Sequence, residues 1–305
     1  MTTAVPASQR QSPADSVARI TAFMTGFSVE VTRPADADFA ALASLDSGTG
    51  VYLSALPNRP IDEAVGTAIQ LRKSGLQPVP HIAVRNFASA RQLDDFLARL
   101  SGDAGVDRVL IIAGDRSECG PFSNALDAIK SGLLPRHGIR TIGIAGYPEG
   151  HPRISDGELK RAMTEKISAA EASGLTVEIV TQFCFDSRAI LDFVGRLRSS
   201  GYAQCVRVGL AGPTSLTSLM RYASRCGVRA SAQALTKRAG LIRQMFATAA
   251  PDDLIVALAE AAPAAVEPHF FSFGGIPATA RWVGTVAEGN IALRTGGGFC
   301  VEAWR

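Results

Sequence analysis

The feature that most constrains the fold of this chain is a regular alternation of short apolar runs with longer amphipathic segments. Eight runs rich in β-branched or apolar residues can be counted, at 26–31, 51–55, 79–84, 108–113, 141–146, 177–183, 205–210 and 269–273. Segments of helical period lie between them, at 61–74, 88–100, 157–173, 188–199 and 216–226. Near-continuous apolar strands indicate a parallel sheet covered by helices, and a count of eight favours closure into a (β/α)₈ TIM barrel over an open sheet.

The length of 305 residues suits one such barrel. We expect a polar N-terminal extension at 1–20, a barrel domain at 21–290 and a C-terminal tail at 291–305. The long gap before the last run contains two segments of helical pattern, 230–245 and 252–262, which we interpret as extra helices before the eighth strand. Three consecutive glycines, 296–298, predict that the tail is loosely held.

Composition excludes several classes of protein. The net charge of +3 is small and the Lys and Arg residues are scattered, so no nucleic-acid partner is expected. Five cysteines form no Cys-x-x-Cys pair and stand at no metal-ligand spacing from the four histidines, so we expect reduced thiols and no metal site. No apolar run approaches the ~18 residues of a membrane span, and the N-terminus lacks the pattern of a signal peptide. A cytoplasmic protein without a membrane partner is the expectation.

Polar side chains are concentrated where the apolar runs end. In a barrel of parallel strands, functional groups collect at the carboxyl ends of the strands. The residues in such positions are Glu30, Ser54, His81, Asp115, Tyr147, His151 and Gln182. A single polar residue at a strand end often only satisfies loop backbone groups. Because these residues follow six strands around one rim, a shared pocket is the better interpretation.

Two segments of the chain resemble a known family. Residues 144–152, IAGYPEGHP, are similar to the Ala-Tyr-Pro-Glu-x-His-Pro segment of the methylenetetrahydrofolate reductases, and residues 180–186, VTQFCFD, are similar to their Ile-Thr-Gln-Phe-Phe-Phe-Asp segment. Shorter likenesses are Ser-Val-Glu at 28–30, Pro-His at 80–81 and Gly-Asp at 114–115. Order and spacing agree from about residue 26 to 274, so the resemblance covers most of the chain.

The resemblance implies a flavoprotein oxidoreductase of one-carbon and methionine metabolism that interconverts 5,10-methylene- and 5-methyltetrahydrofolate. It implies a non-covalently bound FAD across the barrel mouth, with the folate stacked on the flavin ring. By position, the residues expected to contact FAD are Ser54, His81, Gly114, Asp115, Phe122, Ser123, Tyr147 and His151, with Lys166 near the phosphates. Family members are usually oligomeric, which makes a homo-oligomer possible here.

Three residues are candidates for the chemistry that this resemblance implies. Glu30 lies between Val29 and Val31, where desolvation would raise the pKa of a carboxyl and keep it protonated, so we assign it as the general acid for N10 of the folate. Asp115 is expected to stabilise the cationic iminium formed on ring opening, and Gln182 to bind the pterin edge. Simpler roles remain open for each: a partner of a surface cation, a turn or helix cap, and a hydrogen bond to barrel backbone. Tyr147 and His151 could likewise be a packing aromatic and a loop histidine.

Departures from the family pattern leave the electron partner open. Leu216 replaces a phenylalanine that in bacterial members stacks on nicotinamide or folate, and Phe273 begins a stretch that replaces the family's Leu-Asn-Arg. We assign both positions to the substrate side of the site, with NADH, NADPH or another donor unresolved. Three hypotheses follow. The first is a standard reductase; the second is a folate-linked flavoprotein with another electron partner or working toward oxidation; the third is a barrel that binds flavin or folate without turnover, or an unrelated barrel enzyme.

Overall fold

The computed structural model describes residues 12–56, 60, 62–117, 120–226, 228, 248–295 and 297–301. Eight parallel strands form a closed barrel in the order β1-β10-β7-β6-β5-β4-β3-β2. Their bounds are β1 Ser28–Val31, β2 Gly50–Leu53, β3 Gln77–Ala83, β4 Arg108–Ile112, β5 Thr141–Gly146, β6 Thr176–Thr181, β7 Cys205–Ala211 and β10 Val266–Phe271. The predicted (β/α)₈ barrel and its eight strands are therefore confirmed.

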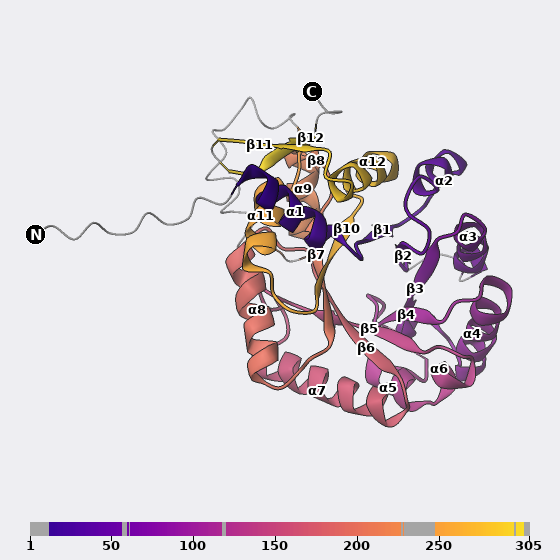
Figure 1. The fold of residues 1–305 in the computed structure, drawn as a ribbon. Coiled ribbons are helices and arrows are strands. Elements are labelled where there is room, and N and C mark those ends of the chain that lie inside the picture. Colours follow the sequence, from indigo (N-terminus) through magenta and orange to yellow (C-terminus); the bar gives the residue numbers. More distant parts are fainter. Residues whose placement is uncertain are drawn as a thin grey trace, which may run out of the picture.

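The helices surround this ring of strands (Figure 1). Their bounds are α1 Pro13–Met24, α2 Asp36–Leu42, α3 Asp62–Lys73, η1 Val84–Asn86, α4 Ala90–Ala104, α5 Ala125–Lys130, α6 Leu133–Arg136, α7 Asp156–Ala172, α8 Ser187–Ser199, α9 Leu216–Cys226, α11 Asp252–Ala261 and α12 Ile276–Ala287. All five predicted amphipathic segments are helical. Within the described residues, no helix combines the length and apolar character needed to cross a membrane.

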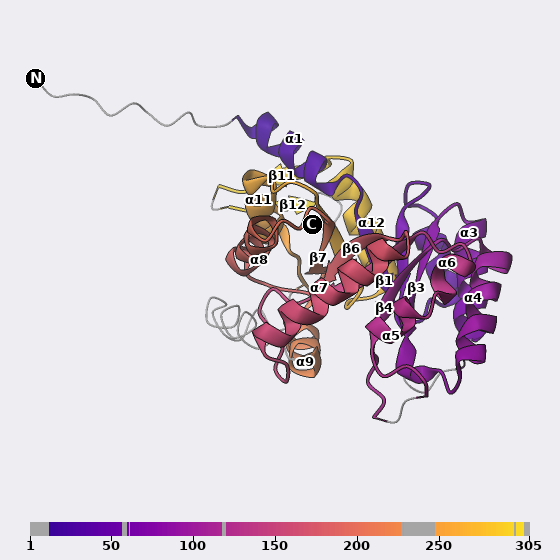
Figure 2. The same cartoon turned by 90° about the horizontal axis from the view of Figure 1, so that it is seen from below.

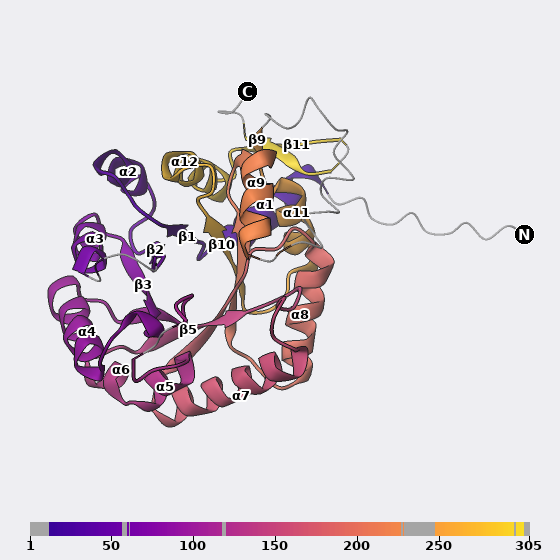
Figure 3. The same ribbon diagram turned by 180° about the vertical axis from the view of Figure 1, so that it is seen from behind.

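The segment between the last two barrel strands carries the elaboration that the sequence predicts. Of the two expected extra helices, the second is confirmed as α11, whereas 230–245 lies outside the described residues. A short antiparallel pair, β8 Thr214–Ser215 and β9 Thr248–Ala249, also lies in this segment. α9 extends from the side of the molecule that is turned away in Figure 1, as Figures 2 and 3 show.

The hydrophobic core has an outer layer, between strands and helices, and a smaller layer inside the barrel. The outer layer is continuous and includes aliphatic residues from all eight strands. Inside the barrel, Tyr52, Val79, Leu110 and Val180 form a separate apolar layer. Because successive residues of a strand point to opposite faces, residues two before and two after these positions also point inward.

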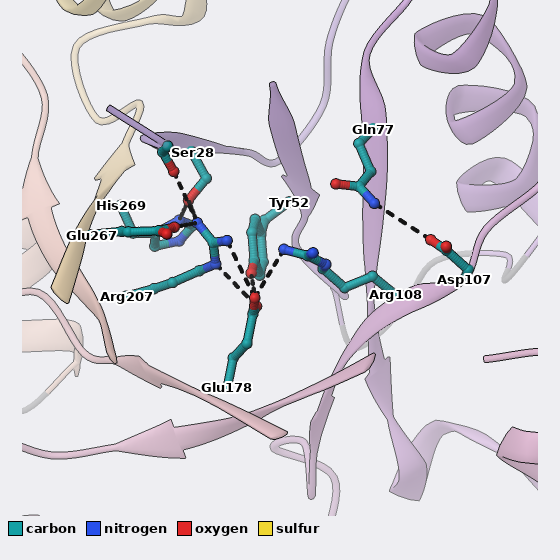
Figure 4. Close-up of polar contacts among 10 residues, drawn as sticks. Ser28, Tyr52, Gln77, Asp107, Arg108, Glu178, Arg207, Glu267 and His269 are labelled. Carbon is teal, nitrogen blue, oxygen red and sulfur yellow. Dashed lines mark hydrogen bonds and ion pairs between the residues drawn. The ribbon is translucent and has the colours of Figure 1, made fainter. Parts of the chain in front are cut away.

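An ion-pair cluster fills the inner barrel below this layer (Figure 4). Glu178 accepts hydrogen bonds from Arg108 Nη1 at 2.9 Å, from Arg207 Nε at 3.0 Å and from the Tyr52 hydroxyl at 3.3 Å. Arg207 also pairs with Glu267, with Nη1 and Oε2 2.9 Å apart. Burial of charge is costly unless each group is paired, and here two carboxylates face two guanidinium groups. We call Arg108, Glu178, Arg207 and Glu267 the barrel ion cluster.

The first and the last described segments of the chain both form regular secondary structure. α1 crosses the boundary predicted at residue 20, and its Ile20 and Met24 are buried. The expectation of a loosely held C-terminal segment is wrong for 291–295 and 297–301, where β11 Ile291–Leu293 and β12 Phe299–Val301 form an antiparallel pair. The reason is that Phe299 is buried and stacks on Trp282, at a centroid separation of 5.9 Å, while Gly297 and Gly298 adopt the positive φ of the connecting turn.

Candidate functional site

Four polar side chains from four neighbouring strands meet at the carboxyl end of the barrel. Ser54, just after β2, donates a hydrogen bond of 2.6 Å to Glu30 Oε1. The other carboxylate oxygen of Glu30, Oε2, lies 3.3 Å from His269 Nε2 and 3.5 Å from His81 Nε2. The Glu30 side chain is 12% exposed, so it remains open to the mouth while its oxygens are held from several sides. We call Glu30, Ser54, His81 and His269 the Glu30 cluster.

The pKa of Glu30 is shifted in the direction opposite to the sequence-based expectation. Burial acts to raise the pKa of this carboxyl, but the charge that His81 can carry and the hydrogen bonds from His269 and Ser54 outweigh it and lower the pKa below its ordinary value. The expectation of a carboxyl kept protonated by desolvation is therefore wrong for the free protein. At neutral pH Glu30 is ionised and able to accept a proton.

His81 faces this carboxylate as a neutral imidazole. Burial lowers the pKa of His81, although the negative charge of Glu30 acts to raise it. Its Nε2 atom is buried and, apart from the 3.5 Å contact with Glu30 Oε2, makes no hydrogen bond to the described residues. A buried polar atom without a partner costs free energy, which a bound ligand could recover. His81 and Ser54 also line a cavity of about 410 Å³ that extends between the ends of β2 and β3 and helix α3.

Asp115 lies at the same end of the barrel, in the loop after β4. It is exposed, and its negative charge adds to burial in raising the pKa of Tyr147, which places the two residues close together. Within the described part of its loop, the Asp115 carboxylate makes no hydrogen bond, so the alternatives of a turn or a helix cap have no support there. Glu30 and Asp115 thus share the barrel mouth, as the sequence predicts, but from strands on different parts of the ring.

Gly114 fixes the path of the chain before Asp115. Its φ of 86° lies in the left-handed region, and a Cβ atom there would stand 3.0 Å from the Cβ of Ala83 on β3. A side chain at this position is strained by both backbone and contact.

Gly114→Ala is expected to lower the free energy of unfolding by about 1–2 kcal/mol. The matched control is Gly102→Ala in helix α4, where a Cβ atom meets nothing within 4 Å. Alanine at this position is expected to raise the free energy of unfolding by about 0.5–1 kcal/mol. Urea denaturation of both variants measures the difference. Equal stability of the two variants would contradict the role assigned to Gly114.

Gln182, Tyr147 and His151 line one small recess between the ends of β5 and β6. The Gln182 side-chain oxygen accepts a hydrogen bond of 3.1 Å from the backbone N–H of Phe183, so its bond to barrel backbone is present. Tyr147 and His151 pack edge to face, with ring centroids 5.1 Å apart. All three residues predicted on these strands therefore gather at one point of the rim.

A large cavity begins beside this recess and contains Lys166. The cavity has a volume of about 1390 Å³ and is lined by the ends of β4 and β5, by Tyr147 and by helices α5, α7 and α8. Lys166, on α7, faces it, and burial lowers the pKa of this lysine. Among the described residues no carboxylate pairs with Lys166. An amine in this setting is suited to bind an anion such as a phosphate.

Phe122 and Ser123 are placed differently from the other predicted contacts. Phe122 is buried in the outer core, and Ser123 donates a hydrogen bond of 2.8 Å to Asp127. Neither residue lines the cavities of 1390 and 410 Å³. Their assignment as flavin contacts stays a prediction.

An aromatic cluster occupies the opposite side of the mouth, where sequence reasoning placed Leu216 and Phe273. Phe273 stacks on Tyr222 of α9, with ring centroids 4.1 Å apart, and packs against Phe183 and Phe271. Leu216 is the first residue of α9. Sequence reasoning missed Tyr222 and His269. His269 could have been noticed as a polar residue in the last apolar run, but only the closed ring shows that it faces Glu30.

Comparisons with known proteins add a family match and structural similarities. The family model described as methylenetetrahydrofolate reductase matches residues 62–244, which is more than half of the chain. Among solved structures, the chain is similar to a dihydropteroate synthase from Thermus thermophilus, with 13% identity, a TM-score of 0.45 and coverage of 85% of this chain and 91% of that chain. It is also similar to a family 18 chitinase from Crocus vernus, with 12% identity, a TM-score of 0.36 and coverage of 61% and 80%.

Proposed function

The chain belongs to the methylenetetrahydrofolate reductase family, and from this membership we propose that it interconverts 5,10-methylene- and 5-methyltetrahydrofolate at the barrel mouth, with FAD as cofactor. The Glu30 cluster carries the proposal, because it holds an ionisable carboxyl at the barrel mouth, where we propose that the folate binds. Bound FAD would supply the hydride in the reducing direction and take it up in the other. A non-catalytic binding barrel has no need for such a carboxyl.

The residues that surround the two cavities fit FAD. Lys166 offers an ammonium group for the phosphates, and Tyr147 lines both that cavity and the recess at the ends of β5 and β6. Ser54 and His81, on the other side of the mouth, are proposed to contact the flavin ring, together with Asp115 and His151. His81 Nε2 is a buried atom whose missing partner a ring heteroatom could provide. Phe122 and Ser123 have the weakest support as cofactor contacts.

Lys166→Met is expected to weaken FAD binding by about 10- to 100-fold, the usual value of a charge-assisted hydrogen bond, and to leave riboflavin binding unchanged. Riboflavin lacks the pyrophosphate, so it reports only the ring and ribityl contacts. Lys73→Met, at an exposed position on helix α3, serves as the control. Fluorescence titration of the flavin-free protein gives both dissociation constants. An equal loss of affinity for FAD and for riboflavin would contradict a contact between Lys166 and the phosphates.

In the reducing direction, Glu30 is proposed to protonate N10 of the folate as the ring between N5 and N10 opens. Asp115 then stabilises the positive charge left on the N5 side, and Gln182 holds the pterin through its amide. Since Glu30 is ionised in the free protein, it must take up a proton before this step. In the oxidising direction the same residue accepts the proton from N10 and is already in the required state.

A second candidate is a family member that works mainly toward oxidation of 5-methyltetrahydrofolate, the direction for which Glu30 is already in the required state. The replacement of an aromatic ring by Leu216 agrees with an electron partner other than NADH. Anaerobic mixing separates the two candidate functions. Bleaching of bound flavin by NADH or NADPH supports the reductase, whereas bleaching by 5-methyltetrahydrofolate but not by NADH or NADPH supports the oxidising enzyme. A purified protein that binds no flavin would contradict both.

The two directions are expected to respond oppositely to pH. Because kcat/KM reports ionisation in the free enzyme, the reducing direction should lose about tenfold per pH unit above the pKa of Glu30, which lies below its ordinary value. The oxidising direction should rise with pH up to that pKa and then stay level through neutrality. Stopped-flow measurement of each half-reaction gives these profiles. A reducing rate that does not change with pH would remove Glu30 as the proton donor.

A further inference from the structure

A chain of buried hydrogen bonds joins the barrel ion cluster to the Glu30 cluster. Arg207 Nη1 contacts Glu267 Oε2 at 2.9 Å, the Gly26 carbonyl oxygen at 3.1 Å and Ser28 Oγ at 3.5 Å, and Ser28 Oγ lies 2.8 Å from His269 Nδ1. The other ring nitrogen of His269 lies 3.3 Å from Glu30 Oε2. Ser28 and His269 are fully buried and Arg207 is nearly so, so this chain is shielded from water. Figure 4 shows Arg207 and Ser28 side by side, with His269 behind them.

Strand register brings these residues together. Ser28 on β1 is paired with His269 on β10, and His269 is paired with Gly209 on β7. Arg207 precedes Gly209 by two residues, so it points to the same inner face one layer lower. Gly209 has no side chain, which leaves the guanidinium of Arg207 as the β7 group nearest to Ser28.

The direction of each hydrogen bond follows from the chemistry of its donor. The carboxylate of Glu30, as an ionised group, can only accept, so Nε2 of His269 carries the proton that is directed at it. In a ring with one proton, Nδ1 is then the acceptor of the Ser28 hydroxyl. A guanidinium group can only donate, so Arg207 faces a lone pair of Ser28 Oγ and leaves the hydroxyl proton free to point at His269.

We propose that Arg207 is a positioning residue that acts through Ser28 to keep the proton of His269 on Nε2, directed at Glu30. The opposite tautomer would present a lone pair to the carboxylate and repel its ionised form. With Nε2–H in place, donors from His269 and Ser54 hold the two oxygens of Glu30 and fix the plane of the carboxyl at the mouth. The consequence for turnover rests on the proposed function; the tautomer does not.

Nitrogen NMR of the full-length protein with ¹⁵N-labelled histidine tests the tautomer directly. Wild-type His269, assigned by its loss in His269→Gln, is expected to show a protonated Nε2 and an unprotonated Nδ1. Ser28→Ala removes the link without changing the ion cluster and is expected to give a mixture of both tautomers, as is Arg207→Met. Arg108→Met is the matched control, because Arg108 shares Glu178 with Arg207 but has no contact with Ser28.

An unchanged Nε2 tautomer in Ser28→Ala would overturn the proposal, as would a mixture of tautomers in the wild-type protein. If Arg207→Met does not fold, Ser28→Ala decides the outcome alone. In turnover, Ser28→Ala is expected to lower kcat by about tenfold with little change in KM, since Glu30 is misaligned while the folate contacts remain. Absence of folate turnover in the wild-type protein would contradict the proposed function and leave the NMR result to judge the role of Arg207.

Discussion

Glu30→Gln is expected to bind FAD as tightly as the wild type and to lose folate conversion in both directions by about 10²- to 10⁴-fold, the contribution of a positioned acid or base. Glutamine keeps the size of the side chain, so the local packing is retained, and its single oxygen can take the place of the carboxylate oxygen that faces Ser54 or of the one that faces His269. What it lacks is an atom that can carry the proton to or from N10. The amide also removes the negative charge that faces His81.

Two measurements separate loss of chemistry from loss of structure in this variant. Reduction of bound flavin by its electron donor should proceed at the wild-type rate, because that half-reaction needs no proton at N10. Glu260→Gln, at an exposed position on α11, should match the wild type in both half-reactions. Wild-type folate turnover in Glu30→Gln would exclude Glu30 from the mechanism.

The largest expected change in stability follows from Glu178→Gln. This substitution leaves Arg108 and Arg207 in the inner barrel without the carboxylate that both of them contact. Their side chains are 22% and 9% exposed, so water can replace only part of the lost partner. Breaking a buried ion pair on one side costs about 3–5 kcal/mol, and we expect the free energy of unfolding to fall by that amount.

Urea denaturation gives this value, with Asp95→Asn as the control. Asp95 pairs with Arg91 on the surface of α4, with Nε and Oδ2 3.8 Å apart and both side chains largely exposed. The decrease in the free energy of unfolding in Asp95→Asn should therefore be too small to measure. A loss below about 1 kcal/mol in Glu178→Gln would mean that water or Glu267 compensates the two arginines.

The strands of the fold could be predicted because most of their residues are apolar, and this signal is local. The eighth strand is the least well placed, since it begins at Val266 and the predicted run begins at 269. Glu267 and Pro268 interrupt its apolar pattern. Glu267 is polar because it faces Arg207 inside the barrel, a contact that no local pattern indicates.

The position of Glu30 could be predicted, but its ionisation could not. Val29 and Val31 suggested an apolar setting, yet neighbours in a strand point to the opposite face and do not surround the carboxyl. The groups that lower the pKa of Glu30 come from other strands: Ser54 is 24 residues away and His269 is 239 residues away along the chain. Such contacts exist only after the ring is formed.

The prediction of a loosely held tail from the glycines near the C-terminus is wrong for a related reason. Gly297 and Gly298 were interpreted as a sign of loose structure, whereas they form the turn between two short strands. The apolar residues that follow, Phe299 and Val301, are the stronger signal, because both are buried against the barrel helices.

The pairing of β1 with β10 makes the Glu30 cluster depend on closure of the barrel. Ser28 and His269 stand 241 residues apart, and their hydrogen bond forms only when the last strand of the ring meets the first. A chain in which β10 is not yet in place has Glu30, Ser54 and His81 but lacks the contact to His269. The full set of contacts to Glu30 therefore exists only in the closed ring.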